Sequence, residues 1–190
     1  MYNPNMKKVI PIILIAGMAH GARADENILF ADTARNAIGL YVAQSTGDDT
    51  LFKLVDASQW EISPQTLVIA KYSQPTKIFR LDARMNLEFV QNIAYHSSRG
   101  LSFFAAGISW DVALLKWHGF YLGIGIGPYM RDSRDRWVDS RLVFGERVFI
   151  GKIICDNWRA EIFTQHFSNG NFTDVNRGFN FVGLGISYSF

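Results

Sequence analysis

The sequence predicts an all-β protein, an eight-stranded antiparallel transmembrane β-barrel. Hydrophobic residues make up 48% of the 190 residues and aromatic residues 14%, yet the mean hydropathy is only +0.04. Apolar and polar residues must therefore be finely interleaved, which argues against disorder. From residue 37 onward the chain alternates with a period of two, in segments near the length of a membrane strand, about 9–11 residues. Beyond residue 20 no run reaches the roughly 18 apolar residues of a spanning helix.

The N-terminus has the pattern of an export signal. Lys7 and Lys8 precede a short apolar stretch, and Ala22-Arg23-Ala24 offers an A-x-A cleavage site. We expect residues 1–24 to be a cleaved signal peptide and residues 25–190 to form the exported barrel domain. Losing the three positive charges of the signal takes the formal net charge from +2 to −1. A nucleic-acid partner is therefore not expected.

The eight predicted strands follow one another along the chain. They cover residues 37–45, 66–74, 79–90, 102–114, 120–127, 140–151, 157–168 and a last segment that ends at Phe190. The alternation is clearest in four of them. In 79–90 apolar residues alternate with arginine, aspartate, asparagine and glutamate. In 102–114 Phe104, Ile108 and Trp110 face opposite to Asp111. In 120–127 large aliphatic residues alternate with glycines, and in the last strand they alternate with glycines and serines.

The two strand faces differ in kind, and this favours a membrane barrel over a soluble sandwich. One face is large and apolar, as lipid requires. The other mixes glycine and serine with opposed charges, namely Arg80, Arg84, Arg141, Arg147 and Arg159 against Asp82, Glu88, Asp111 and Glu161. The interior of an eight-stranded barrel is just wide enough for side chains. We therefore expect these charges to pair in a filled lumen that leaves no pore.

Connection lengths predict the orientation of the barrel. The expected turns at 75–78, 115–118 and 152–156 are short, whereas the connections at 46–65, 93–100, 129–139 and 169–178 are mostly longer. Outer-membrane barrels have short periplasmic turns and longer extracellular loops. The terminal Phe190, with Tyr188 and Ile186 on the same face, resembles the terminal signature of bacterial outer-membrane barrels. The sequence thus predicts a multi-pass protein of the bacterial outer membrane.

The sole cysteine, Cys155, carries no functional prediction. One cysteine forms no internal disulfide, and no other cysteine stands at a zinc-ligand spacing. It is interpreted as a small residue in a turn. We expect neither a metal nor a cofactor.

Chemistry is predicted near the end of the seventh strand. By alternation with the apolar face of 157–168, His166 and Ser168 both point outward, near the extracellular end. Residues two apart on one strand face lie roughly 7 Å apart, close enough for an imidazole to reach a hydroxyl. Polar groups facing lipid are costly, which suggests a function. The alternative is that both lie in the headgroup zone, where polar side chains are ordinary.

The residues that follow resemble a known enzyme family. The resemblance rests on the run His166-x-Ser168-Asn169-Gly170, a loop, Asn176-x-Gly178 and a final strand. This looks like the C-terminal signature of the lipid A 3-O-deacylase (PagL) family. Its specific part covers about the last 25 residues of the chain. The resemblance implies an eight-stranded outer-membrane barrel that hydrolyses an acyl ester of lipid A, a component of lipopolysaccharide.

The resemblance also implies roles for individual residues. It makes His166 the general base and Ser168 the nucleophile of a serine esterase. It makes the Asn169 side chain and the backbone N–H of Asn171 the donors of an oxyanion hole. This fits general chemistry, because serine needs a base to remove its proton and the tetrahedral intermediate needs donors aimed at its oxygen.

One position departs from the family pattern. The third member of the family's site is a glutamate fourteen residues after the histidine, and here that residue is Asn180. An amide oxygen can hold an imidazole tautomer but cannot stabilise its charged form; an acid-to-amide change in a serine triad costs about 10⁴ in turnover. Asn180→Glu is therefore expected to raise activity. Asp174 is an alternative acid. Glu146 also faces lipid by parity, but it lies too far down strand 140–151 to be selected as the acid, and a bulge at this position is an equal alternative.

Loop arginines are candidates for substrate binding. Arg131, Arg134 and Arg136 lie in the expected external loop and could hold lipid A phosphates through bidentate hydrogen bonds. The alternative is a solvated mixed-charge loop. Together with the resemblance, the sequence predicts a membrane-bound lipid A deacylase. It leaves open a catalytically inactive, structural or adhesive barrel, and it leaves open a homodimer.

Overall fold

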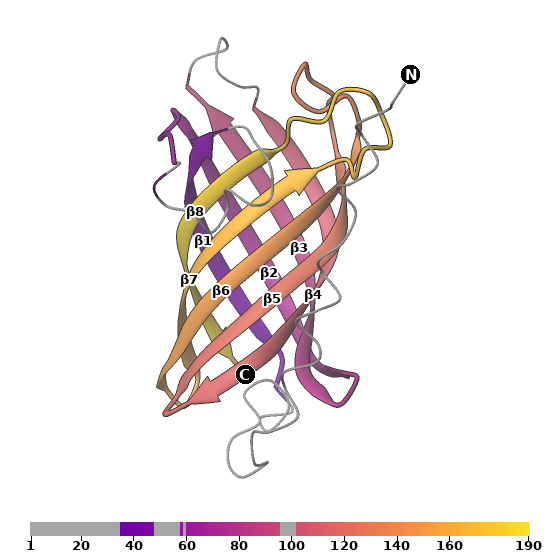
Figure 1. The fold of residues 1–190 in the computed structure, drawn as a ribbon. Coiled ribbons are helices and arrows are strands. Elements are labelled where there is room, and N and C mark those ends of the chain that lie inside the picture. Colours follow the sequence, from indigo (N-terminus) through magenta and orange to yellow (C-terminus); the bar gives the residue numbers. More distant parts are fainter. Residues whose placement is uncertain (1–34, 48–57, 59, 96–101) are drawn as a thin grey trace.

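Eight antiparallel strands close into a barrel in the computed structural model, which describes residues 35–47, 58, 60–95 and 102–190 (Figure 1). The strands are β1 Ala37–Gly47, β2 Gln65–Ile78, β3 Leu81–Ala94, β4 Phe103–Trp117, β5 Phe120–Arg131, β6 Leu142–Cys155, β7 Trp158–Ser168 and β8 Phe179–Ser189. Each strand pairs with its neighbours in sequence, and β1 pairs with β8. The predicted fold class and all eight strands are confirmed. The expected signal peptide lies outside the described residues.

The three tight turns lie at one end of the barrel, each a few residues later than the sequence predicts. The β2–β3 turn is Phe79-Arg80 and the β4–β5 turn is His118-Gly119, and all four residues have positive φ. This is the backbone of a type I′ hairpin, whose twist matches that of the flanking strands. Pro75, which the sequence analysis placed in a turn, lies within β2 opposite Arg84.

The outer surface of the barrel is apolar. Outward positions carry large exposed hydrophobic side chains on seven of the eight strands, among them Leu40, Phe89, Ile108, Ile126, Ile150, Ile162 and Leu184, while on β2 the outward Val68 and Tyr72 are half-buried. A closed barrel leaves no strand edge unpaired, as a hydrocarbon environment requires. Among the described residues, no helix is long and apolar enough to cross a membrane.

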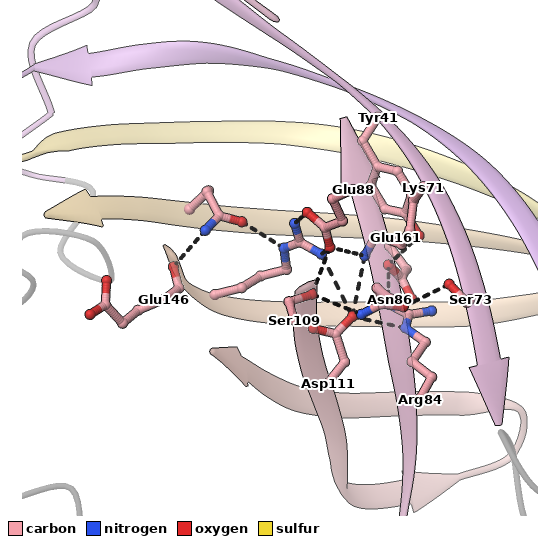
Figure 2. Close-up of polar contacts among 12 residues, drawn as sticks. Tyr41, Lys71, Ser73, Arg84, Asn86, Glu88, Ser109, Asp111, Glu146 and Glu161 are labelled. Atoms are coloured by element: carbon pink, nitrogen blue, oxygen red, sulfur yellow. Dashed lines mark hydrogen bonds and ion pairs between the residues drawn. The ribbon is translucent and has the colours of Figure 1, made fainter. Parts of the chain in front are cut away.

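The lumen is filled by a charged network that we call the lumen cluster: Lys71, Arg84, Glu88, Asp111, Arg147 and Glu161. Figure 2 labels five of them, Lys71, Arg84, Glu88, Asp111 and Glu161, and shows the polar contacts around them. Arg147 donates two hydrogen bonds to Glu88, at 3.1 and 2.9 Å, and Arg84 donates to Asp111 at 2.8 Å. The three cations and three carboxylates balance in charge, which offsets the cost of burying them.

The predicted lumen charges are thus largely correct, but four residues differ from the expectation. Arg80 is exposed in the β2–β3 turn and Arg141 is exposed just before β6, so neither lies in the lumen. Asp82 pairs with Lys116 of β4, apart from the cluster. Lys71 belongs to the cluster, although the sequence analysis did not select it.

Glycines on the inner face make room for the rings that surround the cluster. A Cβ on Gly185 would lie 2.0 Å from the Tyr41 ring, and one on Gly151 would lie 2.1 Å from the Tyr121 ring. The hydroxyls of Tyr41 and Tyr121 both donate to Glu161, at 2.8 and 2.7 Å. The lumen is therefore a packed polar core that fixes the strands carrying the outer surface.

Candidate active site

His166 lies on the outer face of β7, between the two neighbouring strands. Its pairing partners are Glu146 on β6 and Asn180 on β8. The alternation that places Ile162 outward also places His166 outward, as the sequence predicts. Its side chain is nevertheless only 5% exposed.

Asn180 orients the imidazole. The Nδ1 of His166 lies 2.6 Å from the side-chain oxygen of Asn180. An amide oxygen can only accept, so Nδ1 carries the proton and Nε2 keeps its lone pair. This is the tautomer that can accept a proton from a hydroxyl.

Ser168 is the last residue of β7 and lies on the same face as His166. It pairs with Phe144 of β6 and is 8% exposed. Two residues along a strand are roughly 7 Å apart, and among the described residues no hydrogen bond joins the two side chains. Catalytic hydrogen bonds are often long before substrate binds and tighten in the complex.

An aromatic pair lies beside Ser168. The rings of Phe144 and Phe172 pack edge to face with centroids 5.6 Å apart, and Phe172 is 68% exposed. Gly170 has a φ of +64°, and a Cβ at this position would lie 3.3 Å from the Phe144 ring. Glycine at this position thus lets the loop pass close to Phe144 without strain. The pair gives the site an apolar border.

The expected oxyanion donors form hydrogen bonds within the β7–β8 loop. The Asn169 side chain is fully buried and donates to Thr173 Oγ1 at 2.5 Å and to the Val175 carbonyl at 3.1 Å. Its oxygen accepts the Asn171 backbone N–H at 2.9 Å. This conformation therefore offers neither group to a substrate.

Asn176, part of the sequence motif, fastens this loop. Its side chain accepts the Asn169 backbone N–H and donates to the Asn171 side chain, both at 2.9 Å. It also forms a β-bridge with Val138 of the β5–β6 loop. The two loops therefore lie side by side at one end of the barrel, as Figure 1 shows.

The arginines predicted to bind phosphate differ in placement. The expectation for Arg131 is wrong, because it ends β5 pointing inward, is 2% exposed, pairs with Asp135 and stacks on Phe103. Arg134 and Arg136 are exposed in the β5–β6 loop, as expected. Arg177 was not among the predicted arginines, yet it lies with Arg136 at the same ring: the guanidinium carbons of Arg136 and Arg177 each lie 5.0 Å from the Trp137 ring centroid.

The two alternative acids lie in very different places. Glu146 lies directly across the β6–β7 pair from His166, so the expectation that it is too far down its strand is wrong. Asp174 is exposed in the β7–β8 loop, beyond Ser168, and the described residues show no contact between it and His166. Within the described part of the chain, no group of three or more histidine, cysteine, aspartate or glutamate residues is placed to hold a metal ion.

Comparison with known proteins decides the family. The family model for lipid A 3-O-deacylase (PagL) matches residues 37–189, which is well over half of the chain. The chain belongs to the PagL family. The resemblance that the C-terminal motif suggests is therefore confirmed, and no curated protein sequence matches the chain.

Solved structures agree with a PagL-type barrel. The outer-membrane enzyme PagL is 12% identical with a TM-score of 0.55, covering 80% of this chain and 98% of its own. Neisserial surface protein A is 12% identical with a TM-score of 0.52, covering 82% and 97%. A de novo designed transmembrane β-barrel is 10% identical with a TM-score of 0.51, covering 83% and 96%. At these identities the likeness concerns the fold alone. Together with the family, the closed apolar-faced barrel identifies an outer-membrane protein.

Proposed function

We propose that this PagL-family protein is a lipid A deacylase that hydrolyses an ester-linked acyl chain through a serine–histidine site on its outer surface. One observation carries the proposal. His166 faces outward on β7 with Nδ1 held by Asn180, and Ser168 stands two residues further on the same face. A neutral imidazole and a hydroxyl facing the membrane are the groups that an esterase needs for a substrate embedded in lipid.

The reaction follows from these two groups. His166 Nε2 takes the proton from Ser168 Oγ as the oxygen attacks the ester carbonyl carbon. The tetrahedral intermediate collapses, and the sugar alkoxide leaves with the proton that His166 returns. Water, deprotonated by His166, then attacks the acyl-serine, releases the fatty acid and restores the serine hydroxyl.

The position of the site suits lipid A. Ser168 ends its strand next to the loops, where an ester at the headgroup boundary would lie, and the Phe144–Phe172 pair offers an apolar contact for the acyl chain. Asn169 and the Asn171 N–H remain the predicted oxyanion donors. They could serve only after the loop releases the hydrogen bonds they make now.

The decisive experiment is mass spectrometry of lipid A from cells with and without the protein. Loss of one ester-linked acyl chain is expected with the wild type, and Ser168→Ala and His166→Ala should each abolish it. Thr164→Val is the matched control, because it removes another hydroxyl from the same strand two residues from His166. Unchanged lipid A with the folded wild-type protein would overturn the proposal.

The second candidate is a barrel without catalysis, with a structural or adhesive role. The observation in its favour is Asn180, which cannot stabilise an imidazolium by charge as the family's glutamate can. In that case wild type, Ser168→Ala and His166→Ala would all leave lipid A unchanged while still restoring envelope integrity to a deletion strain.

A further inference from the structure

A glutamate is the strand partner of His166 on the side opposite Asn180. Of the five acidic residues in the eight strands, only Glu146 takes an outward position; the others face the lumen. Figure 2 shows its side chain apart from the lumen cluster, with the carboxylate directed away from it. Its Oε2 is buried and has no hydrogen-bond partner among the described residues.

The strand register places Glu146 directly opposite His166. Glu146 and His166 are direct partners in the β6–β7 pairing, and His166 and Asn180 are direct partners in the β7–β8 pairing. Side chains directly opposite each other have Cβ atoms about 4.5–5.5 Å apart. A glutamate is long enough to place its carboxylate against the imidazole ring from this distance.

An unpaired carboxylate on the outer surface is costly and needs an explanation. Ionisable groups facing lipid are rare and mark functional sites, usually with a partner nearby. The position opposite a histidine that must become positively charged during the reaction supplies such a partner.

We propose that Glu146 is a positioning residue that supplies the negative charge which Asn180 lacks. This inference rests on the proposed esterase function. Two strands then share the task that one glutamate performs in the family pattern: Asn180 on β8 holds the tautomer, and Glu146 on β6 stabilises the imidazolium.

The charge gives the size of the expected effect. Opposite charges about 5 Å apart in an effective dielectric of about 20 stabilise the charged histidine enough to change the rate by about 10²-fold. Glu146→Gln should therefore lower kcat by about 10²-fold with KM unchanged, because the interaction exists only when His166 is charged. Asp174→Asn is the control, since that carboxylate is exposed in the loop.

Moving the acid from residue 146 to residue 180 distinguishes an electrostatic role of Glu146 from a structural one. Asn180→Glu in the Glu146→Gln background should restore the lost activity, because the charge returns from the other side of the ring. Because Glu146 would already supply the charge, Asn180→Glu in the wild-type background should change kcat by less than about tenfold, in place of the larger gain expected when Asn180 is considered alone. Full activity of Glu146→Gln, or a folded double variant that stays as slow as Glu146→Gln, would overturn the inference.

A second measurement does not depend on activity. The imidazole ¹⁵N chemical shifts of His166, assigned with His166→Ala, report the fraction of the ring that is charged at one fixed pH near neutrality. That fraction should fall in Glu146→Gln and stay constant in Asp174→Asn. If the charged fraction falls in Glu146→Gln while lipid A is never cleaved, the pairing of Glu146 with His166 stands and the esterase proposal fails. If the charged fraction stays constant in an enzyme that cleaves lipid A, the esterase proposal stands and the role of Glu146 is refuted.

Discussion

Replacing Arg147 with methionine should destabilise the barrel by about 3 kcal/mol, at the lower end of the cost of breaking a buried ion pair. The side chain makes two hydrogen bonds to Glu88, at 3.1 and 2.9 Å, and one to Gln165 at 2.8 Å. Methionine fills a similar volume but leaves the lumen cluster with one excess negative charge. The cost stays at the lower end because Ser109, Tyr129 and Lys71 still contact Glu88.

The assay is urea unfolding of the barrel reconstituted in lipid vesicles, followed by tryptophan fluorescence. Glu88→Gln in the Arg147→Met background removes the excess charge and keeps a group that can bond to Ser109. The double variant should therefore be more stable than Arg147→Met alone. A loss below about 1 kcal/mol in the single variant, or a double variant whose loss equals the sum of the two single losses, would refute charge balance as the basis of lumen stability.

Three further predictions concern the inner face, the orientation and the loop. Gly151→Ala should destabilise the barrel by about 1–3 kcal/mol in the same urea assay, because the added methyl group meets the Tyr121 ring. On intact cells a large polyethylene-glycol maleimide should fail to label Cys155, which is exposed at the tight-turn end, but should label a Phe172→Cys variant. Labelling of Cys155 without labelling at position 172 would show that the barrel has the opposite orientation. Asn169→Ala should make the β7–β8 loop more sensitive to protease, because the loop loses three hydrogen bonds; unchanged cleavage would contradict this.

The fold could be predicted almost completely because a strand with one face toward lipid and one toward the lumen produces alternating apolar and polar residues in the sequence. Each strand separates lipid from lumen, so a period of two appears wherever the chain crosses the membrane. The exact positions of the turns could not be predicted as well. The two-residue turn Phe79-Arg80 contains no typical turn residue, whereas Pro75, which usually indicates a turn, lies within β2.

The candidate site could be predicted only in part, since alternation fixes a residue's face but not its neighbours. Parity correctly places His166, Ser168 and Asn180 outward. The proximity of Glu146 depends on the β6–β7 register, which the sequence pattern does not contain. The bonds of Asn169 depend in the same way on the conformation of a loop rather than on any periodicity.

The two faces of β6 and β7 connect the lumen to the site. Glu146 and His166 face outward, while their chain neighbours Arg147 and Gln165 face inward and hydrogen-bond to each other at 2.8 Å. Gln165 also donates to the Glu146 carbonyl at 3.3 Å. The strands that carry the site on one face carry the lumen cluster on the other, so the rigidity of the site depends in part on the packing inside the barrel. Arg147→Met should therefore slow ester hydrolysis as well as weaken the barrel, although Arg147 lies on the far side of the strand from the substrate. If Arg147→Met kept full kcat in a folded barrel, the lumen would serve stability alone.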